Sequence, residues 1–496
     1  MGIKSLLIRP YADYVSYKVR QWSEKPFEAQ DKILKSILSI AATTAFGKEH
    51  HFDAIKTYDD FRQRVPLHSY EQFKPYIERM KGGEKNVTWP GKPVYFATTS
   101  GTTSGIKYIP ITRDSVKNHF YTAQAALLLY MMNTGNWRIM DGKMLFLSGS
   151  PELEKTSDIP TGRLSGIVNH KIPAYLRANR LPSWKTNCIA NWETKIEAIA
   201  DETLHQNITL ISGIPPWVQM YFDKLVQKAG KPVREIFPEL QILVHGGVNF
   251  EPYRARLEQS LGGKIPTLET YPASEGFFAF QDLPANEGLL LNADSGIFYE
   301  FVQAAHIFTP NAKRLSLREV QQGVNYALVI SSNAGLWGYV PGDTVKFVST
   351  NPCRLVVTGR ISQYISAFGE HVIAEEVEQA LHESLAGGNI SVTEFTVAPF
   401  VQAGSDEPPH HRWLIEFEKE PDNLAEFATQ LNRLMCGKNS YYNDLIKGKV
   451  IHPLRITALR KNAFRDYMKA QGKLGGQNKV PHLSNDRQMA ELLLEQ

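Results

Sequence analysis

Residues 95–110 read YFATTSGTTSGIKYIP and carry the strongest local pattern in this chain of 496 residues. A β-like run enters a loop of eight threonine, serine and glycine residues, and Lys107 opens a second β-like run. Glycines let a backbone approach an anion, the hydroxyls add donors, and Lys107 adds a positive charge. The loop lacks the spacing of a P-loop and precedes a strand. It predicts either a phosphate site of another kind or a polar surface hairpin.

The segments around this loop predict an α/β body. Residues 1–90 are expected to be mostly helical, because Ile33, Leu34, Ile37, Leu38 and Ile40 have the spacing of one buried helical face. From there to about residue 350, short apolar β-rich runs alternate with helical patterns, which favours a largely buried sheet. The β-like runs include 93–97, 144–147, 208–211, 241–244 and 326–330, and the helices include 192–201 and 216–228.

A different pattern begins near residue 360. A helix and two β-like runs precede an amphipathic helix, and another strand and another helix follow. This order is typical of a small α+β domain of about 130 residues, which is a size that can fold independently. The sequence therefore predicts an α/β protein with a large N-terminal domain, residues 1–360, and a smaller C-terminal α+β domain, residues 361–496.

Composition excludes several classes of protein. The 55 basic and 51 acidic residues leave a net charge of +4, too small to indicate nucleic acid as the main partner. The three cysteines are scattered and odd in number, so a disulfide framework is not expected. Arg9 and Pro10 interrupt the N-terminal apolar run, which argues against a secretory signal. We expect a soluble, cytoplasmic protein without a membrane span.

A second motif is TYPASEGFFAF at residues 270–280, where Glu275 follows Ser274 and stands among aromatic residues. A carboxylate in such apolar surroundings is costly to bury unless it is paired, hydrogen-bonded or bound to a metal. Mg²⁺ on nucleotide phosphates needs only one or two protein carboxylates. Glu275 is therefore a candidate metal ligand. It could equally cap a helix or lie on a loop edge.

The remaining motifs lie nearer the C-terminus. In GYVPGDTVKF, residues 338–347, Asp343 follows a Pro-Gly turn and could accept ribose hydroxyls or form an Asx turn. Arg360 ends a β-like run and is either a ribose or phosphate contact or part of an ordinary connection. Lys473 and Lys479 lie in a glycine-rich segment that could stabilise charge on phosphate oxygens or form a basic surface.

The order of these motifs resembles the Gretchen Hagen family of acyl-acid amido synthetases, which belong to the adenylate-forming superfamily. The match is to a bacterial-type member and runs over nearly the whole chain. Residues 356–377 are similar to the superfamily's hinge motif, and residues 241–253 are similar to its adenine-contacting Gly-Gly loop. The three nucleotide motifs of the family are matched by Thr99–Gly105 with Lys107, by Tyr271 with Ser274-Glu275, and by Tyr339 with Gly342-Asp343.

The resemblance implies a role for each matched position. The positions implied to bind the nucleotide are Thr99, Ser100, Gly101 and Thr102 at the phosphates, Gly246, Gly247 and Tyr271 at the adenine, Ser274 in the same motif as Tyr271, and Asp343 and Arg360 at the ribose. Glu275 would bind Mg²⁺. Lys107 would stand near the phosphates, and Lys479 maps to the catalytic lysine of the C-terminal domain, with Lys473 as its competitor.

The sequence departs from the family in two places. Ser362 stands where the superfamily's hinge usually carries Asp or Lys. Plant members hold the acyl carboxylate with an arginine on the helix after the phosphate loop, where this chain offers Asn118 and His119. The acyl pocket would use the helix at 116–132 and the rings of Phe277, Phe278 and Phe280, unless these rings are plain core. A plant-hormone substrate is not expected.

The resemblance predicts a two-step ligase that uses ATP and Mg²⁺. A small carboxylic acid would be activated as an acyl-adenylate and then joined to an amine, with amino acids among the candidates. One alternative passes the acyl group to the thiol of coenzyme A or a carrier protein. Another is a nucleotide-binding regulator that does not catalyse. The sequence leaves the oligomeric state open, and a monomer is compatible with it.

Overall fold

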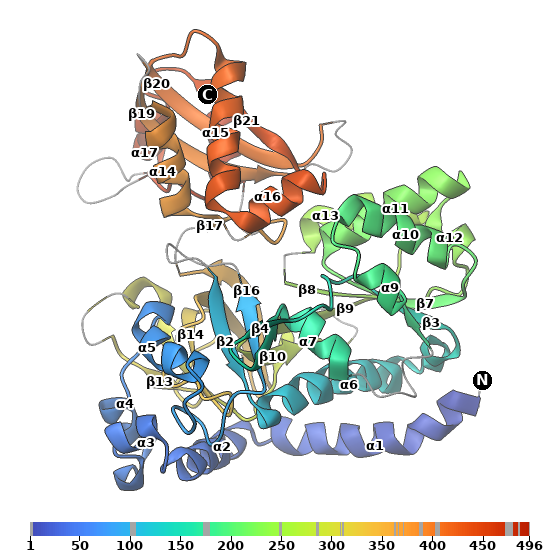
Figure 1. The fold of residues 1–496 in the computed structure, drawn as a ribbon, viewed down its shortest axis with the longest axis vertical. Coiled ribbons are helices and arrows are strands. Elements are labelled where there is room, and N and C mark those ends of the chain that lie inside the picture. Colours follow the sequence, from blue (N-terminus) through green and yellow to red (C-terminus); the bar gives the residue numbers. More distant parts are fainter. Residues whose placement is uncertain are drawn as a thin grey trace.

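The computed structural model describes residues 3–99, 106–171, 179–247, 250–283, 287–307, 309, 312–361, 364–365, 367–370, 372–385, 390–401, 407–471, 480–484 and 487–495. Within these residues, twelve strands join into one mixed sheet at the centre of the protein (Figure 1). Its order is β13–β12–β14–β15–β16–β11–β10–β9–β8–β7–β3–β6. The strands are β3 Lys143–Phe146, β6 Arg180–Leu181, β7 Ile208–Ser212, β8 Ile242–Gly246, β9 Thr267–Ala273, β10 Gly276–Phe280, β11 Leu289–Leu291, β12 Ile297–Gln303, β13 Leu315–Ser316, β14 Asn325–Ser332, β15 Asp343–Thr350 and β16 Cys353–Arg360.

The sheet has a parallel half and an antiparallel half that meet at β9. Strands β9, β8, β7, β3 and β6 pair in parallel, whereas the pairings from β9 through β10, β11, β16, β15, β14 and β12 to β13 are antiparallel. Parallel strands need crossover connections, usually helices, which cover both faces of the sheet. The predicted alternation of strands and helices therefore describes the parallel half best.

Helices cover both faces of the parallel half. The helices of this part of the chain are α6 Arg113–Thr134, α7 Leu164–Lys171, α9 Trp184–Asn187, α10 Trp192–Thr203, α11 Pro215–Ala229, α12 Val233–Ile236 and α13 Glu251–Leu261. Successive strand residues point to opposite faces. Accordingly, Ile242 packs with α6 and the long helix α1, Ile3–Ser23, while Leu243 packs with α10, α11 and α13. Helices α1 and α6 lie side by side beneath the sheet (Figure 1).

Short N-terminal helices cover the antiparallel half. They are α2 Pro26–Ala41, α3 Ala45–Glu49, α4 Tyr58–Arg64 and α5 Tyr70–Lys81, as the sequence predicts for this region. On α2, Ile33, Leu34, Ile37 and Leu38 are buried, but Ile40 is 47% exposed, which corrects the expected buried face.

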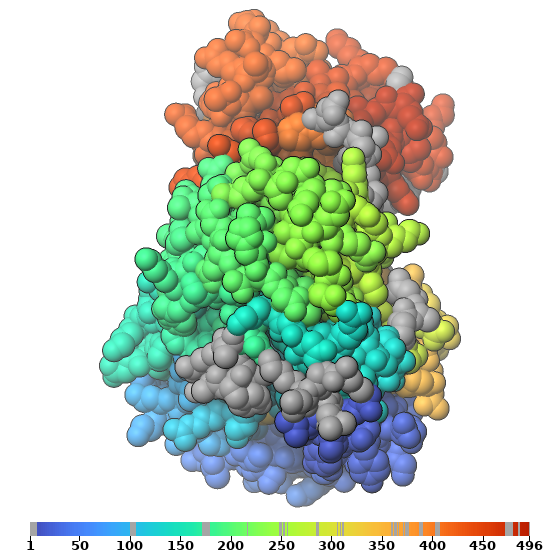
Figure 2. All heavy atoms as spheres, turned by 90° about the vertical axis from the view of Figure 1, so that its right-hand side faces the viewer, coloured from blue at the N-terminus to red at the C-terminus, as the bar shows by residue number. Residues whose placement is uncertain are grey.

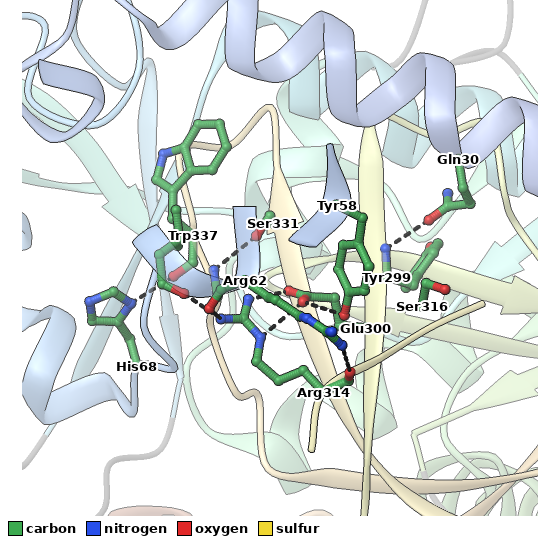
Figure 3. Close-up of polar contacts among 12 residues, drawn as sticks. Gln30, Tyr58, Arg62, His68, Tyr299, Glu300, Arg314, Ser316, Ser331 and Trp337 are labelled. Atoms are coloured by element: carbon green, nitrogen blue, oxygen red, sulfur yellow. Dashed lines mark hydrogen bonds and ion pairs between the residues drawn. The ribbon is translucent and has the colours of Figure 1, made fainter. Parts of the chain in front are cut away.

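A buried ion pair holds α4 against the sheet (Figure 3). The Arg314 guanidinium donates to both carboxylate oxygens of Glu300 at 2.9 and 2.6 Å. The Tyr58 hydroxyl on α4 donates to the same carboxylate at 3.0 Å. Glu300 is 0% exposed and Arg314 is 7% exposed, so the pair is shielded from solvent.

The two strands that flank the serine–threonine segment belong to a smaller sheet. Its order is β2–β1–β5–β4, with β1 Tyr95–Thr99, β2 Lys107–Ile111, β4 Glu154–Thr156 and β5 Ile159–Gly162. Strands β1 and β2 pair as an antiparallel hairpin, and β1 pairs with β5 in parallel. The predicted strand before the loop and the predicted strand that opens at Lys107 are therefore both present.

The C-terminal part has its own sheet, β19–β20–β21, as the sequence predicts for this region. Its elements are β17 Tyr364–Ile365, β18 Val372–Ile373, α14 Ala374–Leu385, β19 Ser391–Phe400, β20 His410–Lys419, α15 Leu424–Lys438, α16 Ser440–Lys447, β21 His452–Leu459, α17 Ala463–Ala470 and α18 Gln488–Leu494. The sequence did not indicate α16 or α18. The division into domains at residues 360 and 361 stays a prediction.

The C-terminal part rests on the helices of the parallel half (Figure 2). Gly448, after α16, packs against Trp192 at the start of α10. The Arg163 guanidinium lies 3.4 Å from the Asp444 carboxylate and 4.6 Å from the ring centroid of Tyr441. A second pair, Lys449 with Glu193, lies at 3.0 Å. Both ion pairs are at the surface: each of their four side chains is at least 39% exposed. Within the described part of the chain, every helix is too short or too polar to span a membrane.

Candidate functional site

The carboxyl ends of the parallel strands mark the candidate site. Strands β3, β7, β8 and β9 are parallel neighbours, so their last residues meet at one edge of the sheet. In open α/β sheets, ligands bind outside this edge. Two of the predicted motifs, at Gly246 and at Tyr271–Glu275, lie here.

The Gly-Gly motif ends β8 at a place where a side chain does not fit. Gly246 pairs with Thr270 of β9, and a Cβ atom at Gly246 would lie 2.2 Å from the Thr270 carbonyl oxygen. Gly247 has φ +81°, a backbone conformation that favours glycine. The loop can therefore bring its backbone close to a ligand. The adenine contact of these glycines stays a prediction.

A segment from the C-terminal side approaches this loop. The side chain of Ile214 adjoins both Gly247 and Gly369. The Tyr253 hydroxyl on α13 donates a hydrogen bond to the Ala367 carbonyl oxygen. Ala367 and Gly369 therefore lie near the end of β8 and near α13.

The second motif forms a tight hairpin. Gly276 of β10 pairs with Ala273 of β9, which leaves Ser274 and Glu275 as the turn. Glu275 is half-buried at this turn and does not cap a helix. The rings of Phe277, Phe278 and Phe280 are 6%, 0% and 1% exposed and pack in the hydrophobic core, as the plain-core alternative expected.

Tyr271 connects the second motif to the third. Its hydroxyl donates to Oδ2 of Asp343 at 2.6 Å, and both residues are buried. Its ring makes an edge contact with Phe278 at 5.1 Å, which fixes its orientation. Asp343 is the first residue of β15, at the strand start that the sequence indicated, and is the register partner of Arg360 on β16. The backbones of both predicted ribose contacts are thus adjacent.

The first motif is described only at its two ends. Thr99 and Lys107 are register partners at the loop end of the β1–β2 hairpin. The Lys107 ammonium lies 5.4 Å from the ring centroid of Tyr70 on α5. The predicted phosphate ligands Ser100, Gly101 and Thr102 lie outside the described residues, as do Lys479, Lys473 and Ser362 and the side chain of Arg360.

The two residues expected at the position of the plant arginine, Asn118 and His119, differ in their surroundings. Asn118 donates to the Ser295 carbonyl oxygen, and its Nδ2 also lies 3.3 Å from Oδ1 of Asn333, so it holds two loops together. His119 is 5% exposed on α6, and burial lowers its pKa to about 4. At neutral pH this imidazole is therefore uncharged and cannot replace the positive charge of an arginine.

A buried lysine on α10, which the sequence did not indicate, contacts the loop that leaves β3. Lys195 on α10 is 1% exposed, and its ammonium donates to the carbonyl oxygens of Ser148 and Asn187 at 2.8 and 2.6 Å. Burial lowers its pKa to about 8. These bonds fix the loop that leaves β3 at the carboxyl edge of the sheet. The sequence does contain a signal for this burial: Lys195 is four residues before Ile199, and this spacing places both residues on the buried face of α10.

Comparison with known proteins gives a consistent family assignment. The GH3 family N-terminal domain matches residues 16–187 and 178–267, the GH3 family central domain matches residues 290–360, and the GH3 family C-terminal domain matches residues 375–488. The indole-3-acetic acid-amido synthetase GH3.8 of Oryza sativa subsp. indica is 33% identical over 94% of this chain and 89% of its own. The jasmonoyl–L-amino acid synthetase GH3.5 of Oryza sativa subsp. japonica is 22% identical over 92% of each chain.

Solved structures share the fold. The AtGH3.15 acyl acid amido synthetase in complex with 2,4-DB matches with a TM-score of 0.63 at 16% identity and covers 98% of this chain and 96% of its own. A 2-hydroxyisobutyryl-CoA ligase in its thioesterification state matches with a TM-score of 0.57 at 14% identity, over 94% of this chain and 91% of its own. The predicted α/β fold of the adenylate-forming type is therefore confirmed.

Proposed function

We propose a function from one premise: this chain belongs to the GH3 (Gretchen Hagen) family, whose domain models match most of its length. The protein is an ATP-dependent acyl-acid amido synthetase, a ligase that activates a carboxylic acid as an acyl-adenylate and joins it to an amine. The plant relatives are named for the conjugation of jasmonate or indole-3-acetic acid. Their membership of the same family supports an amino acid as the amine here.

The observation that carries this proposal is the hydrogen bond from Tyr271 to Asp343. It joins two motifs that are 72 residues apart in the chain, and it does so beside the carboxyl edge where the Gly-Gly loop ends. A buried carboxylate held by a tyrosine at such an edge suits the two hydroxyls of a ribose. Tyr271 lies on the first strand of the hairpin whose turn carries Glu275.

In the first step, an oxygen of the substrate carboxylate attacks the α-phosphorus of ATP. The bond from this phosphorus to the bridging oxygen breaks, and pyrophosphate leaves. The hydroxyls and amides of residues 99–102 bind the phosphates, and Lys107 and Lys479 neutralise negative charge on the phosphate oxygens. Gly246 and Gly247 receive the adenine, and Asp343 and Arg360 orient the ribose. Ser274 supports the turn at which Glu275 is presented.

In the second step, the nitrogen of an amine attacks the acyl carbon of the adenylate. An amide forms, and AMP and a proton are released. A domain of residues 361–496 that moves relative to residues 1–360 would admit the amine after adenylation and exclude water before it. The proposed location of the reaction is the cytoplasm.

Mg²⁺ is the proposed metal. Among the described residues, no three His, Cys, Asp or Glu side chains gather as a ligand set. That fits a metal that arrives with ATP, because Mg²⁺ on nucleotide phosphates takes one or two protein carboxylates and completes its shell with phosphate and water. Glu275 would supply one such oxygen ligand. The bound ion would neutralise phosphate charge during adenylation.

A pyrophosphate-exchange screen over aryl, fatty and amino acids tests the proposal, because exchange requires adenylation of an added acid. Release of AMP is then measured with a panel of amino acids and with coenzyme A. If AMP release depends on coenzyme A and on no amino acid, the product would be a thioester and not an amide. If the protein binds ATP but catalyses no exchange with any acid, the result would support a nucleotide-binding regulator that does not catalyse.

The Glu275→Ala variant tests the metal ligand. We expect exchange to be lost while the protein remains folded by circular dichroism, and Glu235→Ala, an exposed glutamate on α12, serves as the control with exchange intact. Full exchange in Glu275→Ala would refute the assignment of the metal.

A further inference from the structure

Helix α1 lies at the edge of the molecule and buries one of its two faces. The buried residues share a hydrophobic core with α6, and they are Ala12, Val15, Val19 and Trp22. In Figure 1, α6 runs along the inner side of α1, and the opposite side of α1 faces outward. The outward side of a surface helix normally carries charged and polar residues. The outward side of α1 departs from this pattern.

Tyrosine rings dominate the outward side of α1. Tyr14 and Tyr17 are 54% and 57% exposed, and Leu7 and Tyr11 are exposed beside them. Tyr121 of α6 continues this surface: burial raises the pKa of Tyr121, and the nearby hydroxyls of Tyr11 and Tyr14 raise it further. These five residues form one contiguous surface, the tyrosine face.

The tyrosine face has the area of the apolar centre of a dimer interface. A tyrosine side chain has about 150–250 Å² to bury, and these four are about half exposed, so roughly 400 Å² of their surface remains in solvent. A standard interface buries about 800 Å² on each partner, and about 65% of a homodimer interface is apolar. The four rings together with Leu7 supply most of that apolar share. Contiguous apolar patches of this size mark interaction sites.

Two residues on one flank of the tyrosine face carry opposite charges. Asp13 and Arg20 are exposed, and within the described part of the chain neither side chain forms an ion pair. Seven residues make two turns of a helix, so both lie on the same flank, about 10.5 Å apart along the axis. This distance is too great for an ion pair within one helix. Both charges are therefore available to a second molecule.

We propose that the tyrosine face binds a second copy of this chain across a two-fold axis. An axis perpendicular to α1 makes the two helices antiparallel and brings the same flank of both together. With the axis at the level of Ser16 and Tyr17, the Asp13 carboxylate of each copy faces the Arg20 guanidinium of the other. The Tyr14 ring of each copy then lies near the Tyr17 ring of the other. The interface has an aromatic centre and two symmetric ion pairs at its rim.

The charges around the tyrosine face favour a protein partner over a membrane. Helices that lie on anionic lipid are rich in Lys and Arg on their polar side. Here Asp13 and Glu24 are exposed beside Lys18 and Arg20. An anionic lipid surface would meet the two carboxylates as well as the two cations, whereas a second copy of α1 pairs charges of opposite sign.

Sedimentation velocity of the full chain over a wide range of protein concentration tests the dimer. We expect the mass to rise with concentration from 56.0 kDa to twice this value. In the double variant Tyr14→Ser/Tyr17→Ser, the dissociation constant of the dimer should rise at least about tenfold, because aromatic anchors dominate such interfaces. Both rings are exposed, so the variant should keep the circular dichroism of the wild type. A wild type that remains a monomer at every concentration would overturn the proposal.

Charge reversals test the antiparallel arrangement. Asp13→Arg and Arg20→Asp each place like charges opposite each other, so each should raise the dissociation constant about tenfold or more. The double variant Asp13→Arg/Arg20→Asp restores opposite charges and should dimerise like the wild type. A mixture of the two single variants should form a heterodimer, because every pair across the axis then joins a positive and a negative side chain. Asp422→Arg, an exposed residue before α15, is the control and should leave the dissociation constant unchanged.

Two other results would refute the proposal. A dimer whose dissociation constant is the same in all of these α1 variants would place the interface elsewhere. Flotation with vesicles of phosphatidylcholine and phosphatidylserine is the second measurement, and monomers that bind these vesicles through Tyr14 and Tyr17 would assign the face to a membrane. None of these measurements uses ligase activity, so they decide the dimer even if the proposed function fails.

Discussion

Removal of one oxygen atom tests the connection between the second and third motifs. The Tyr271→Phe substitution keeps the ring that packs on Phe278 but deletes the hydroxyl that donates to Asp343 at 2.6 Å. The Asp343 side chain remains at the start of β15 but loses one buried donor. The substitution therefore perturbs the orientation of this carboxylate while it conserves the hydrophobic packing.

The expected magnitude follows from the type of bond. A hydrogen bond to a charged group contributes about 1.5–3 kcal/mol. We expect the free energy of unfolding of Tyr271→Phe to be lower than that of the wild type by an amount within this range. For the free energy of ATP binding we expect a loss at the lower end of this range, about 1.5 kcal/mol, because backbone pairing still fixes Asp343. This loss corresponds to a dissociation constant for ATP that is about tenfold higher.

Isothermal titration calorimetry with ATP and MgCl₂ measures this constant without knowledge of the acid. Tyr299→Phe is the matched control, because it deletes a buried hydroxyl 3.2 Å from the Asn292 carbonyl oxygen on another part of the sheet. It should lower stability and leave ATP affinity unchanged. ATP affinity within twofold of the wild type in Tyr271→Phe, or an equal loss in Tyr299→Phe, would refute a ribose site at Asp343.

Two further predictions concern buried charges. Glu300→Leu leaves Arg314 buried without its carboxylate, so it should lower the free energy of unfolding, measured with denaturant, by about 3–5 kcal/mol. The double variant with Arg314→Met should recover most of that loss. Equal stability of the single variant and the wild type would contradict this prediction. For Lys195, whose folded pKa is about 8, the unfolded chain binds more protons between pH 8 and about 10.5. The stability of the wild type relative to Lys195→Met should therefore rise with pH across this window, by at most about 1.4 kcal/mol per pH unit, and a flat difference between urea unfolding at pH 7.5 and 9.5 would contradict it.

Several local features of the site could be predicted from the sequence because short-range chemistry determines them. The Pro-Gly turn puts Asp343 at the first position of β15, and the change from small polar residues to β-formers puts Lys107 at the first position of β2. The glycines at the end of β8 were identified through their resemblance to a family motif, and the structure gives the physical reason for Gly246.

The contacts between distant segments could not be predicted in the same way. The bond between Tyr271 and Asp343 depends on the registers of β9, β10, β11, β16 and β15, which no spacing in the sequence reveals. The sequence around Lys195 does not distinguish it from an exposed lysine on a helix, and its burial results from the loop that covers it. Ile40 lies about 90° around α2 from the centre of the buried stripe, so its apolar side chain faces solvent.

The contact between α16 and the body of the protein has a consequence for turnover. Arg163 with Asp444 and Lys449 with Glu193 are exposed ion pairs, and pairs of this kind contribute at most about 1 kcal/mol each. Water and salt can replace them almost without loss. The two ion pairs thus contribute little to the free energy that holds the C-terminal part in this position, and they can be replaced by contacts with water when that part moves.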